Sequence, residues 1–253
     1  MTETSVSNKE SQPELPVNSV LADIANALGE KKRAVLSAPP GAGKTTLVPL
    51  HLLKQDWRCD GKIILLEPRR LAARAAAGRM AALLGEKVGD TVGYRMRLDN
   101  RISSRTRVEV VTEGVFARMV LDDPELSGVS TVIFDEFHER SLDGDFGLAL
   151  ALDVQTGLRD DLRLLVMSAT LDISRISQLM DDAPVIQSLG RTFPIDIRYE
   201  DRWQGVSTDE KVAKAIIEAH ASETGSILAF LPGQSEITRT AARLENRFPE
   251  NTD

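Results

Sequence analysis

Cysteine is almost absent from this chain of 253 residues, since Cys59 is the only one. A single thiol cannot form a disulfide within the chain or build a zinc site that needs two or more thiolates. No early segment combines basic residues with an apolar run as a signal peptide does, and no run of about 18 apolar residues could span a bilayer. The sequence therefore predicts a cytoplasmic protein without a membrane partner.

Histidine is also scarce, with three in the chain. The pair His138 and Glu139 lacks the second histidine of an H-E-x-x-H motif, because Leu142 stands in its place. His51 and His220 have no spacing that suits metal ligation. The sequence therefore argues against a zinc enzyme.

Negative charge predominates overall, and the formal net charge of −7 taken alone argues against a nucleic-acid partner. The distribution is uneven, because residues 58–107 contain 12 Lys or Arg and 5 Asp or Glu. This segment carries +7 and leaves −14 for the rest of the chain. Such asymmetry can concentrate positive potential on one face, although solvated helix surfaces would explain it equally well.

Short apolar runs alternate with helical patterns along the first three quarters of the chain. The runs are Ala34–Ser37, Ile63–Leu66, Val108–Val111, Val132–Phe134 and Leu162–Met167, and the helical patterns are Leu21–Leu28, Leu47–Leu53, Leu71–Leu84, Val115–Leu121 and Leu148–Val154. Continuous apolar strands that alternate with helices predict an α/β fold, with a parallel sheet covered by helices on both faces.

Composition divides the chain into three parts. Residues 1–16 are polar and aperiodic, which predicts a disordered tail, and residues 17–190 hold the α/β unit. Residues 191–253 begin a second α/β unit that we expect to be incomplete, because it is far shorter than a usual domain of about 100–150 residues. Its predicted strands are Ile195–Tyr199 and Ile227–Leu231, and its predicted helices are Val212–Ala221 and Glu236–Phe248.

A glycine-rich turn follows the first predicted strand. Glycines let backbone N–H groups approach phosphate oxygens, and the following helix adds its positive N-terminal end. Lys44 supplies a positive charge for the terminal phosphates, and the Thr45 hydroxyl can ligate Mg²⁺. Ala38 replaces the first glycine of the G-x-x-x-x-G-K-[ST] pattern, but the strand–turn–helix context favours a nucleotide-binding loop over a chance turn. Its residues are Ala38, Pro39, Pro40, Gly41, Ala42, Gly43, Lys44 and Thr45.

An acidic pair follows the strand predicted at Val132–Phe134. Asp135 at the C-terminal end of a parallel strand is placed to hold Mg²⁺, together with Thr45 and Glu136. Glu136 can also polarise the attacking water as a general base. Two carboxylates could instead cap the following helix, but their pairing with the phosphate-binding loop favours a site for ATP and Mg²⁺.

Seven further features of the sequence, in order, are similar to motifs of the DEAH/RHA helicases of superfamily 2. The similar segments are Glu67–Ala73 (motif Ia), Val92–Arg97 (a V-G-Y-x-x-R loop), Thr112–Gly114 (motif Ib), Asp135–His138 (motif II), Ser168–Thr170 (motif III), Gly190–Pro194 (the entry to a second domain) and Phe230–Gly233 (motif IV). The resemblance covers residues 19–248. It implies a RecA-like P-loop NTPase domain followed by the start of a second RecA-like domain.

The resemblance also implies roles for individual side chains. Arg69, Arg70 and Thr112 resemble contacts to the nucleic-acid backbone, although exposed arginines can simply aid solubility. Arg79 resembles the arginine that stacks on the nucleotide base, and Thr46 joins the nucleotide-binding residues. The resemblance makes His138 a catalytic residue together with Lys44 and Glu136. Ser168 and Thr170 resemble the residues that link the state of the γ-phosphate to the grip on the nucleic-acid strand.

The implied activity is that of an ATP-dependent helicase on single-stranded or partly duplex nucleic acid, with RNA favoured but DNA left open. Motifs V and VI do not occur, so we expect the C-terminal half of the helicase, with its arginines for the γ-phosphate, to be missing. Because an arginine finger contributes roughly 10³–10⁵ in rate, we expect weak hydrolysis and no unwinding. The alternative is a nucleotide-gated nucleic-acid-binding module. A small P-loop kinase is less consistent, because no acceptor-site pattern is present.

Overall fold

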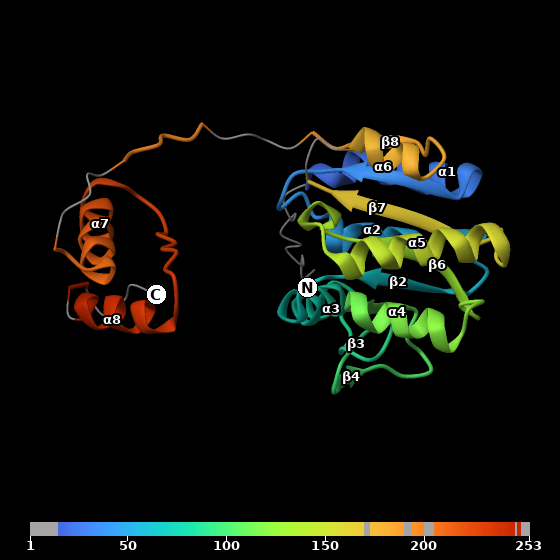
Figure 1. Ribbon diagram of the computed structural model, residues 1–253, viewed down its shortest axis with the longest axis horizontal. Coiled ribbons are helices and arrows are strands. Elements are labelled where there is room, and N and C mark those ends of the chain that lie inside the picture. Colours follow the sequence, from blue (N-terminus) through green and yellow to red (C-terminus); the bar gives the residue numbers. More distant parts are fainter. Residues whose placement is uncertain (1–14, 170–172, 190–193, 200–204, 246, 249–253) are drawn as a thin grey trace, which may run out of the picture. The chain divides into compact units, whose positions relative to one another are not determined.

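The computed structural model (Figure 1) describes residues 15–169, 173–189, 194–199, 205–245, 247 and 248. Most of the tail predicted for residues 1–16 lies outside the described residues, and so does Thr170. The chain divides into two compact units, one ending at position 192 and the other beginning at 193. None of the helices in the described ranges combines the length and apolar character that crossing a membrane requires.

The first unit is built on an eight-stranded sheet with the order β4-β3-β5-β2-β6-β7-β1-β8. Every neighbouring pair is parallel except β3 and β4, which form an antiparallel edge. The predicted parallel sheet is therefore confirmed, with β4 as its one reversed strand. The strands are β1 (Arg33–Ser37), β2 (Lys62–Leu66), β3 (Val92–Met96), β4 (Asp99–Arg101), β5 (Val108–Val111), β6 (Val129–Phe134), β7 (Arg163–Ser168) and β8 (Val185–Gln187).

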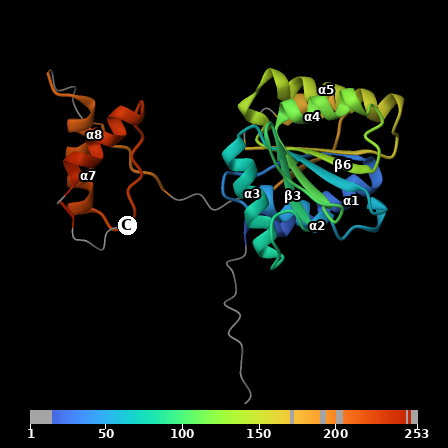
Figure 2. The ribbon, with the colours of Figure 1, turned by 90° about the horizontal axis from the view of Figure 1, so that it is seen from below.

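Helices cover both faces of this sheet, as Figure 2 shows in an edge-on view. One face packs against α1 (Leu21–Lys31), α2 (Lys44–Leu52) and α3 (Arg70–Leu83). The other packs against α4 (Glu113–Asp122), α5 (Leu142–Gly157) and α6 (Ile173–Leu179). Short 3₁₀ turns occur at Pro16–Val20, Asp56–Arg58 and Phe137–Glu139. Burial on both faces explains why the central strands are continuous apolar runs rather than alternating ones.

Three aromatic rings anchor the end of β6 to the helices above it. Phe116 of α4 and Phe134 of β6 lie edge to face with centroids 5.8 Å apart, and Phe137 meets Phe134 in the same way at 6.2 Å. Such edge-to-face pairs add about 0.5–1.5 kcal/mol beyond area burial. Phe137 thus holds in place the 3₁₀ turn that follows Glu136.

Three strands and a helix toward the two ends of the sheet are not predicted by apolar runs. The segment predicted as a loop at Val92–Arg97 is the strand β3, which pairs with β5 along its length. Gly93 and Arg95 interrupt its apolar pattern, so the strand is recognisable only from its neighbour. The remaining missed elements are β4, β8 and α6.

The second unit contains α7 (Thr208–Ser222) and α8 (Gln234–Leu244). Asp209 of α7 accepts hydrogen bonds from Arg239 and Arg243 of α8, at 3.3 and 2.7 Å. The strands predicted at Ile195–Tyr199 and Ile227–Leu231 are wrong, because neither segment is a strand in the described part of this unit. A strand needs backbone partners, and no described neighbour offers them here.

Gly93 is predicted to be required in β3, because a Cβ atom there would clash with the backbone carbonyl oxygen of Arg101. Changing Gly93→Ala should lower the free energy of unfolding by about 1–3 kcal/mol, since a backbone atom must move. Urea unfolding followed by circular dichroism measures this. The matched control is Gly78→Ala in α3, where a Cβ would meet nothing within 4 Å. This control should be neutral or stabilising by up to about 1 kcal/mol. Equal effects of the two changes would contradict the prediction.

Candidate functional site

The predicted motifs meet at one edge of the sheet. Residue pairing places Ser37 of β1 beside Ser168 of β7, and Leu66 of β2 beside both Phe134 of β6 and Val111 of β5. Because these strands are parallel and end at nearly the same level, the segments that follow them emerge on the same side. The phosphate-binding loop, the acidic turn and the segments after β2, β5 and β7 therefore share this edge.

Two glycines give the phosphate-binding loop backbone conformations that other residues rarely adopt. Gly41 and Gly43 have φ angles of 75° and 89°, in the left-handed region that favours glycine. A Cβ on Gly43 would also lie 2.8 Å from a methyl carbon of Leu15. Ala38 has no positive φ, and its side chain is buried while its N–H donates to the Ser168 carbonyl at 3.0 Å. The first glycine of the general pattern is therefore dispensable here.

Two side chains at the start of α2 reach across to the acidic turn. The Lys44 ammonium lies 2.8 Å from Glu136 Oε1, and the Thr45 hydroxyl donates to Asp135 Oδ2 at 2.5 Å. Lys44 and Asp135 are each 3% exposed, so one partner in each contact is shielded from water. The backbone N–H of Glu136 also donates to Asp135 Oδ1 at 2.8 Å. The residues predicted for phosphate, metal and water are thus in direct contact.

The Thr45 hydroxyl and the Asp135 carboxylate suit a magnesium ion. Both present oxygen atoms, which are the ligands that Mg²⁺ prefers. In the described ranges, no group of three or more His, Cys, Asp or Glu could hold a metal ion by itself. A site with one carboxylate and one hydroxyl matches the way Mg²⁺ is bound beside a nucleotide, where phosphate and water oxygens complete the coordination.

Glu136 and His138 lie on a strained turn that touches the segment after β7. Glu136 has a φ of 49°, which is uncommon for a residue with a side chain and typical of functional sites. His138 Nδ1 accepts a hydrogen bond from the Ala169 N–H at 3.3 Å and lies 3.3 Å from Glu136 Oε2. An unprotonated Nδ1 accepts from Ala169, whereas a protonated Nδ1 would instead donate to Glu136, so the two contacts belong to different protonation states of the imidazole. His138 thus connects motif II to motif III, of which Ser168 is buried.

Burial raises the pKa of two carboxyl groups at this edge. The pKa of Asp135 is raised to about 6, chiefly by loss of hydration, although Thr45 and Lys44 favour its charged form. The pKa of Glu67 is raised to about 7, first by burial and then by the negative charges of Asp135 and other nearby carboxylates. Glu67 is 4% exposed, and its carboxylate accepts a weak hydrogen bond from the Arg69 N–H at 3.4 Å. The site therefore holds more negative charge than it can easily stabilise without a cation.

A cavity of about 380 Å³ opens beside Thr45, and we call it the nucleotide-side cavity. Thr46 and the exposed Arg79 of α3 line it, so the cavity brings together three of the residues predicted to bind nucleotide, while the rest of the phosphate-binding loop lies outside its lining. Arg69 lines the same cavity and forms an ion pair with Glu139 at 2.7 Å. The complete lining is Thr45, Thr46, Glu67, Arg69, Ala72, Ala75, Ala76, Arg79, Glu136 and Glu139.

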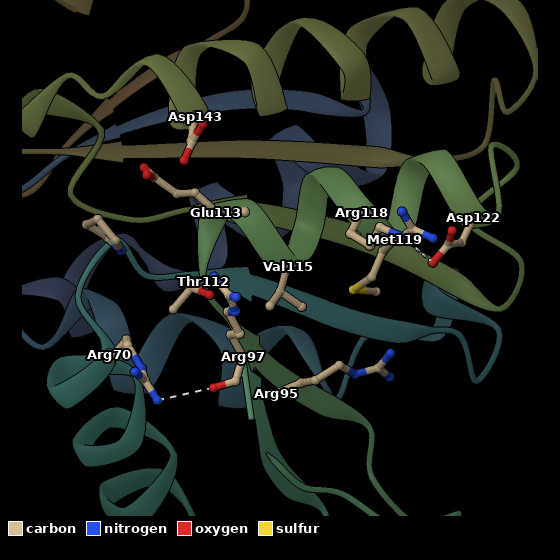
Figure 3. Close-up of a pocket in the computed structure, with 12 residues that line it drawn as sticks. Arg70, Arg95, Arg97, Thr112, Glu113, Val115, Arg118, Met119, Asp122 and Asp143 are labelled. Atoms are coloured by element: carbon tan, nitrogen blue, oxygen red, sulfur yellow. Dashed lines mark hydrogen bonds and ion pairs between the residues drawn. The ribbon is translucent and has the colours of Figure 1, made fainter. Parts of the chain in front are cut away.

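A second cavity of about 640 Å³ lies between the start of α3, the end of β3 and α4 (Figure 3), and we call it the basic groove. Arg70 and Thr112 both line it, and Arg70 donates to the Arg97 carbonyl at 3.2 Å. The structure therefore separates Arg69 from the other two predicted nucleic-acid residues. The complete lining is Pro68, Arg70, Arg95, Arg97, Thr112, Glu113, Gly114, Val115, Arg118, Met119, Asp122 and Asp143.

Residue-by-residue prediction misses Arg95, Arg97 and Arg118 of the basic groove. Arg95 and Arg97 fall within the segment that carries a charge of +7, so the charge asymmetry was a usable signal for them. Arg118 pairs with Asp122 on the same helix at 2.9 Å, and its sequence pattern resembles an ordinary surface ion pair.

This chain is similar in sequence to known proteins. The sequence pattern of the DEAD/DEAH box helicase family matches residues 19–179. The chain is 56% identical over 234 residues to the ATP-dependent RNA helicase HrpB of Escherichia coli (strain K12), which covers 92% of this chain and 29% of that protein. It is 34% identical over 247 residues to an ATP-dependent RNA helicase HrpA homolog of Haemophilus influenzae, with 94% of this chain and 18% of that protein covered.

Solved structures match at the level of the fold as well. A crystal structure of the Escherichia coli DEAH/RHA helicase HrpB superposes with a TM-score of 0.88 at 55% identity, covering 94% of this chain and 30% of that one. A crystal structure of the E. coli DExH-box NTPase HrpB gives a TM-score of 0.80 at 54% identity, covering 96% and 30%. This chain therefore spans less than a third of the length of these relatives.

The raised pKa of Glu67 predicts that stability depends on pH. A folded state that raises the pKa of a carboxyl group binds more protons than the unfolded chain between the two pKa values. The Glu67 contribution is therefore fully present below 4.5 and is lost as pH rises through about 7. Changing Glu67→Gln should make the melting temperature fall less over this window, measured by thermal unfolding with a metal chelator present. The exposed Glu30→Gln is the matched control, and a Glu67 variant with the same pH slope as this control would contradict the prediction.

Proposed function

This chain belongs to the DEAD/DEAH box helicase family, and we propose that it binds Mg-ATP at the phosphate-binding loop and RNA in the basic groove. The contact of Lys44 and Thr45 with Glu136 and Asp135 carries the nucleotide part of this proposal. Two segments about 90 residues apart in sequence supply the phosphate charge, the metal ligands and the general base at one point. A chance glycine-rich turn would not meet an acidic pair in this way.

The ion pair between Lys44 and Glu136 joins the phosphate-binding loop to the acidic turn. Terminal phosphates need the same ammonium group, so their arrival would draw Lys44 away from Glu136. The Glu136 carboxylate is then released to accept a proton from a water molecule positioned for attack. Nucleotide binding and activation of the general base are thereby linked through one side chain.

The other residues of the site bind and orient. Thr45 and Asp135 would hold Mg²⁺, which when bound neutralises the charge that develops on the phosphate oxygens. Arg79 offers its guanidinium plane to the base at the outer end of the nucleotide-side cavity, and a stacked arginine tolerates different bases. His138 ties the acidic turn to the segment after β7 through Ala169, so a movement of either segment reaches the other.

The basic groove suits a phosphate backbone. Arg70, Arg95, Arg97 and Arg118 line it, and the first turn of α4 begins at Glu113 immediately after Thr112. Arginines and a helix N-terminus are the usual contacts to nucleic-acid phosphates, and they carry no sequence preference. We favour RNA because the chain's relatives at 56% and 34% identity are named as RNA helicases.

The start of α3 connects the two cavities. The consecutive residues Arg69 and Arg70 line the nucleotide-side cavity and the basic groove respectively. Glu67, two residues before Arg69, is buried and lies near the carboxylates of the acidic turn. A shift of this turn on nucleotide binding would therefore move a residue of the groove, which is the coupling that a helicase requires.

The remaining predictions from sequence stay part of this proposal. We propose that residues 191–253 are the start of a second RecA-like domain, that the protein works in the cytoplasm, and that it acts on single-stranded or partly duplex RNA. A second candidate function is a nucleotide-gated module that grips nucleic acid without unwinding it. Binding of Mg-ATP and RNA without turnover would favour that module.

Turnover of ATP with and without polyuridylate tests the proposal. We expect Mg-ATP to bind and to be hydrolysed slowly, roughly 10³-fold below a relative that carries motifs V and VI. Stimulation by RNA supports a helicase-type ATPase, whereas binding without turnover supports the gated module. Changing Glu136→Gln should lower any turnover by roughly 10²–10⁴-fold while nucleotide binding remains, because only the general base is lost. The exposed Glu125→Gln is the control, and failure of the unmodified chain to bind Mg-ATP would overturn the proposal.

A further inference from the structure

A buried carboxylate lies beneath the basic groove and has no part in the function described above. Glu109 is in the middle of β5, among apolar residues, and is 1% exposed. Arg95 of β3 places its Nε 2.6 Å from Glu109 Oε1, and Lys62 of β2 places its ammonium 3.7 Å from Oε2. Two basic residues from the two neighbouring strands thus enclose one acid.

The register of the sheet explains how these side chains meet. Glu109 pairs with Gly93 of β3 and with Ile64 of β2, and Arg95 follows Gly93 by two residues on the same strand. Side chains two residues apart point to the same face of a sheet, so Arg95 and Glu109 share the face beneath α4. Because Gly93 has no side chain, nothing at that position separates them.

The contact engages the inner end of the Arg95 guanidinium. Its Nε and both Glu109 oxygens are shielded from solvent, and the contact is an ion pair rather than an aligned hydrogen bond. The side chain as a whole is 37% exposed and lines both the basic groove and an adjoining cavity of about 210 Å³. Among the described residues, no other ion pair or hydrogen bond engages the terminal nitrogens of Arg95. The outer edge of the guanidinium can therefore donate to a ligand in the groove.

In this arrangement Glu109 holds the Nε side of the Arg95 guanidinium, and the two terminal nitrogens are left for bidentate binding of a ligand. A carboxylate on the Nε side fixes the plane of a guanidinium, and the terminal amino groups keep the geometry that matches a phosphate. A lysine could not take part in the same way, since its single ammonium cannot serve both partners in fixed directions. The pair is also costly to break from one side, because a buried charge is left without its partner.

We propose that Glu109 is a positioning residue that fixes Arg95 so that its outer edge faces the phosphates of single-stranded RNA in the basic groove. This inference rests on the proposed function of the groove. Glu109 does not touch the RNA and acts only through Arg95. Lys62 offsets the remaining negative charge and stays outside the groove.

Simple electrostatics makes the opposite prediction for the key variant. Removing a negative charge near an RNA site should strengthen binding, because fewer carboxylates repel the phosphates. If Glu109 positions Arg95, the change Glu109→Gln should instead weaken binding, on the order of fivefold, because the orientation is lost. The direction of the effect therefore distinguishes positioning from charge alone.

The experiment measures the affinity of the full chain for a fluorescently labelled oligouridylate by anisotropy. A double-mutant cycle with Glu109→Gln and Arg95→Met isolates the coupling. We expect each single change to weaken RNA binding and Glu109→Gln to have no further effect when Arg95 is already Met. Lys62→Met is the matched control, which removes the other partner of Glu109 and should leave RNA affinity unchanged. Affinity for Mg-ATP and thermal unfolding should report any general damage.

Arg95→Lys keeps the inference testable if Glu109→Gln fails to fold. This variant keeps the positive charge and loses the fork, so we expect it to bind RNA as weakly as Arg95→Met. Arg95→Lys with unchanged affinity, or Glu109→Gln with unchanged or tighter binding, would overturn the inference alone. Arg70→Ala should weaken binding in either case, because Arg70 lines the same groove. Failure of the unmodified chain to bind RNA would overturn the proposed function of the groove and this inference together.

Discussion

The hydrogen bond between the Thr45 hydroxyl and the Asp135 carboxylate is the constraint on which the rest of the site depends. It joins the segment after β1 to the segment after β6, and β7 lies between those two strands in the sheet. Because these strands are parallel and lie close together in the sheet, the loops that follow them meet at one edge. Lys44 and Glu136, which adjoin Thr45 and Asp135 in the sequence, are thereby brought into contact as well. The same edge presents Glu67 and Thr112, so the sheet order also places the start of α3 between the two cavities.

Burial makes this arrangement responsive to its ligands. Asp135 and Lys44 are almost inaccessible to water, and this burial raises the pKa of the Asp135 carboxyl group. A cation and a set of phosphates would relieve both conditions at once, because Mg²⁺ would neutralise the carboxylate and Lys44 would exchange Glu136 for phosphate oxygens. Stabilisation of this kind is strong where water is excluded. The basic groove, which Arg70 lines, is the larger of the two cavities and is lined by several arginines.

The sequence predicted the central part of the fold and the segments that meet at the candidate site, because both depend on local patterns. Buried parallel strands leave continuous apolar runs, and acidic or glycine-rich segments after such runs must fall at one edge. The separation of Arg69 from Arg70 was missed because the two were treated as one contact to nucleic acid, although adjacent positions at the start of a helix point in different directions. The role of Glu109 depends on partners from two other strands, and nothing in its own strand indicates them. The strands expected at Ile195–Tyr199 and Ile227–Leu231 illustrate the converse, since apolar composition without a neighbouring strand does not make a sheet.

The central claim is that Lys44 and its neighbours form a cradle for the phosphates of a magnesium nucleotide. Calorimetric titration of Mg-ATP into the unmodified chain and into Lys44→Ala tests it most directly. The account predicts saturable binding by the unmodified chain that needs Mg²⁺, and a loss of at least roughly tenfold in affinity in the variant, since a charge-assisted contact to phosphate contributes about 1.5–3 kcal/mol. Equal affinities of the two chains, or binding that is indifferent to removal of Mg²⁺, would contradict it.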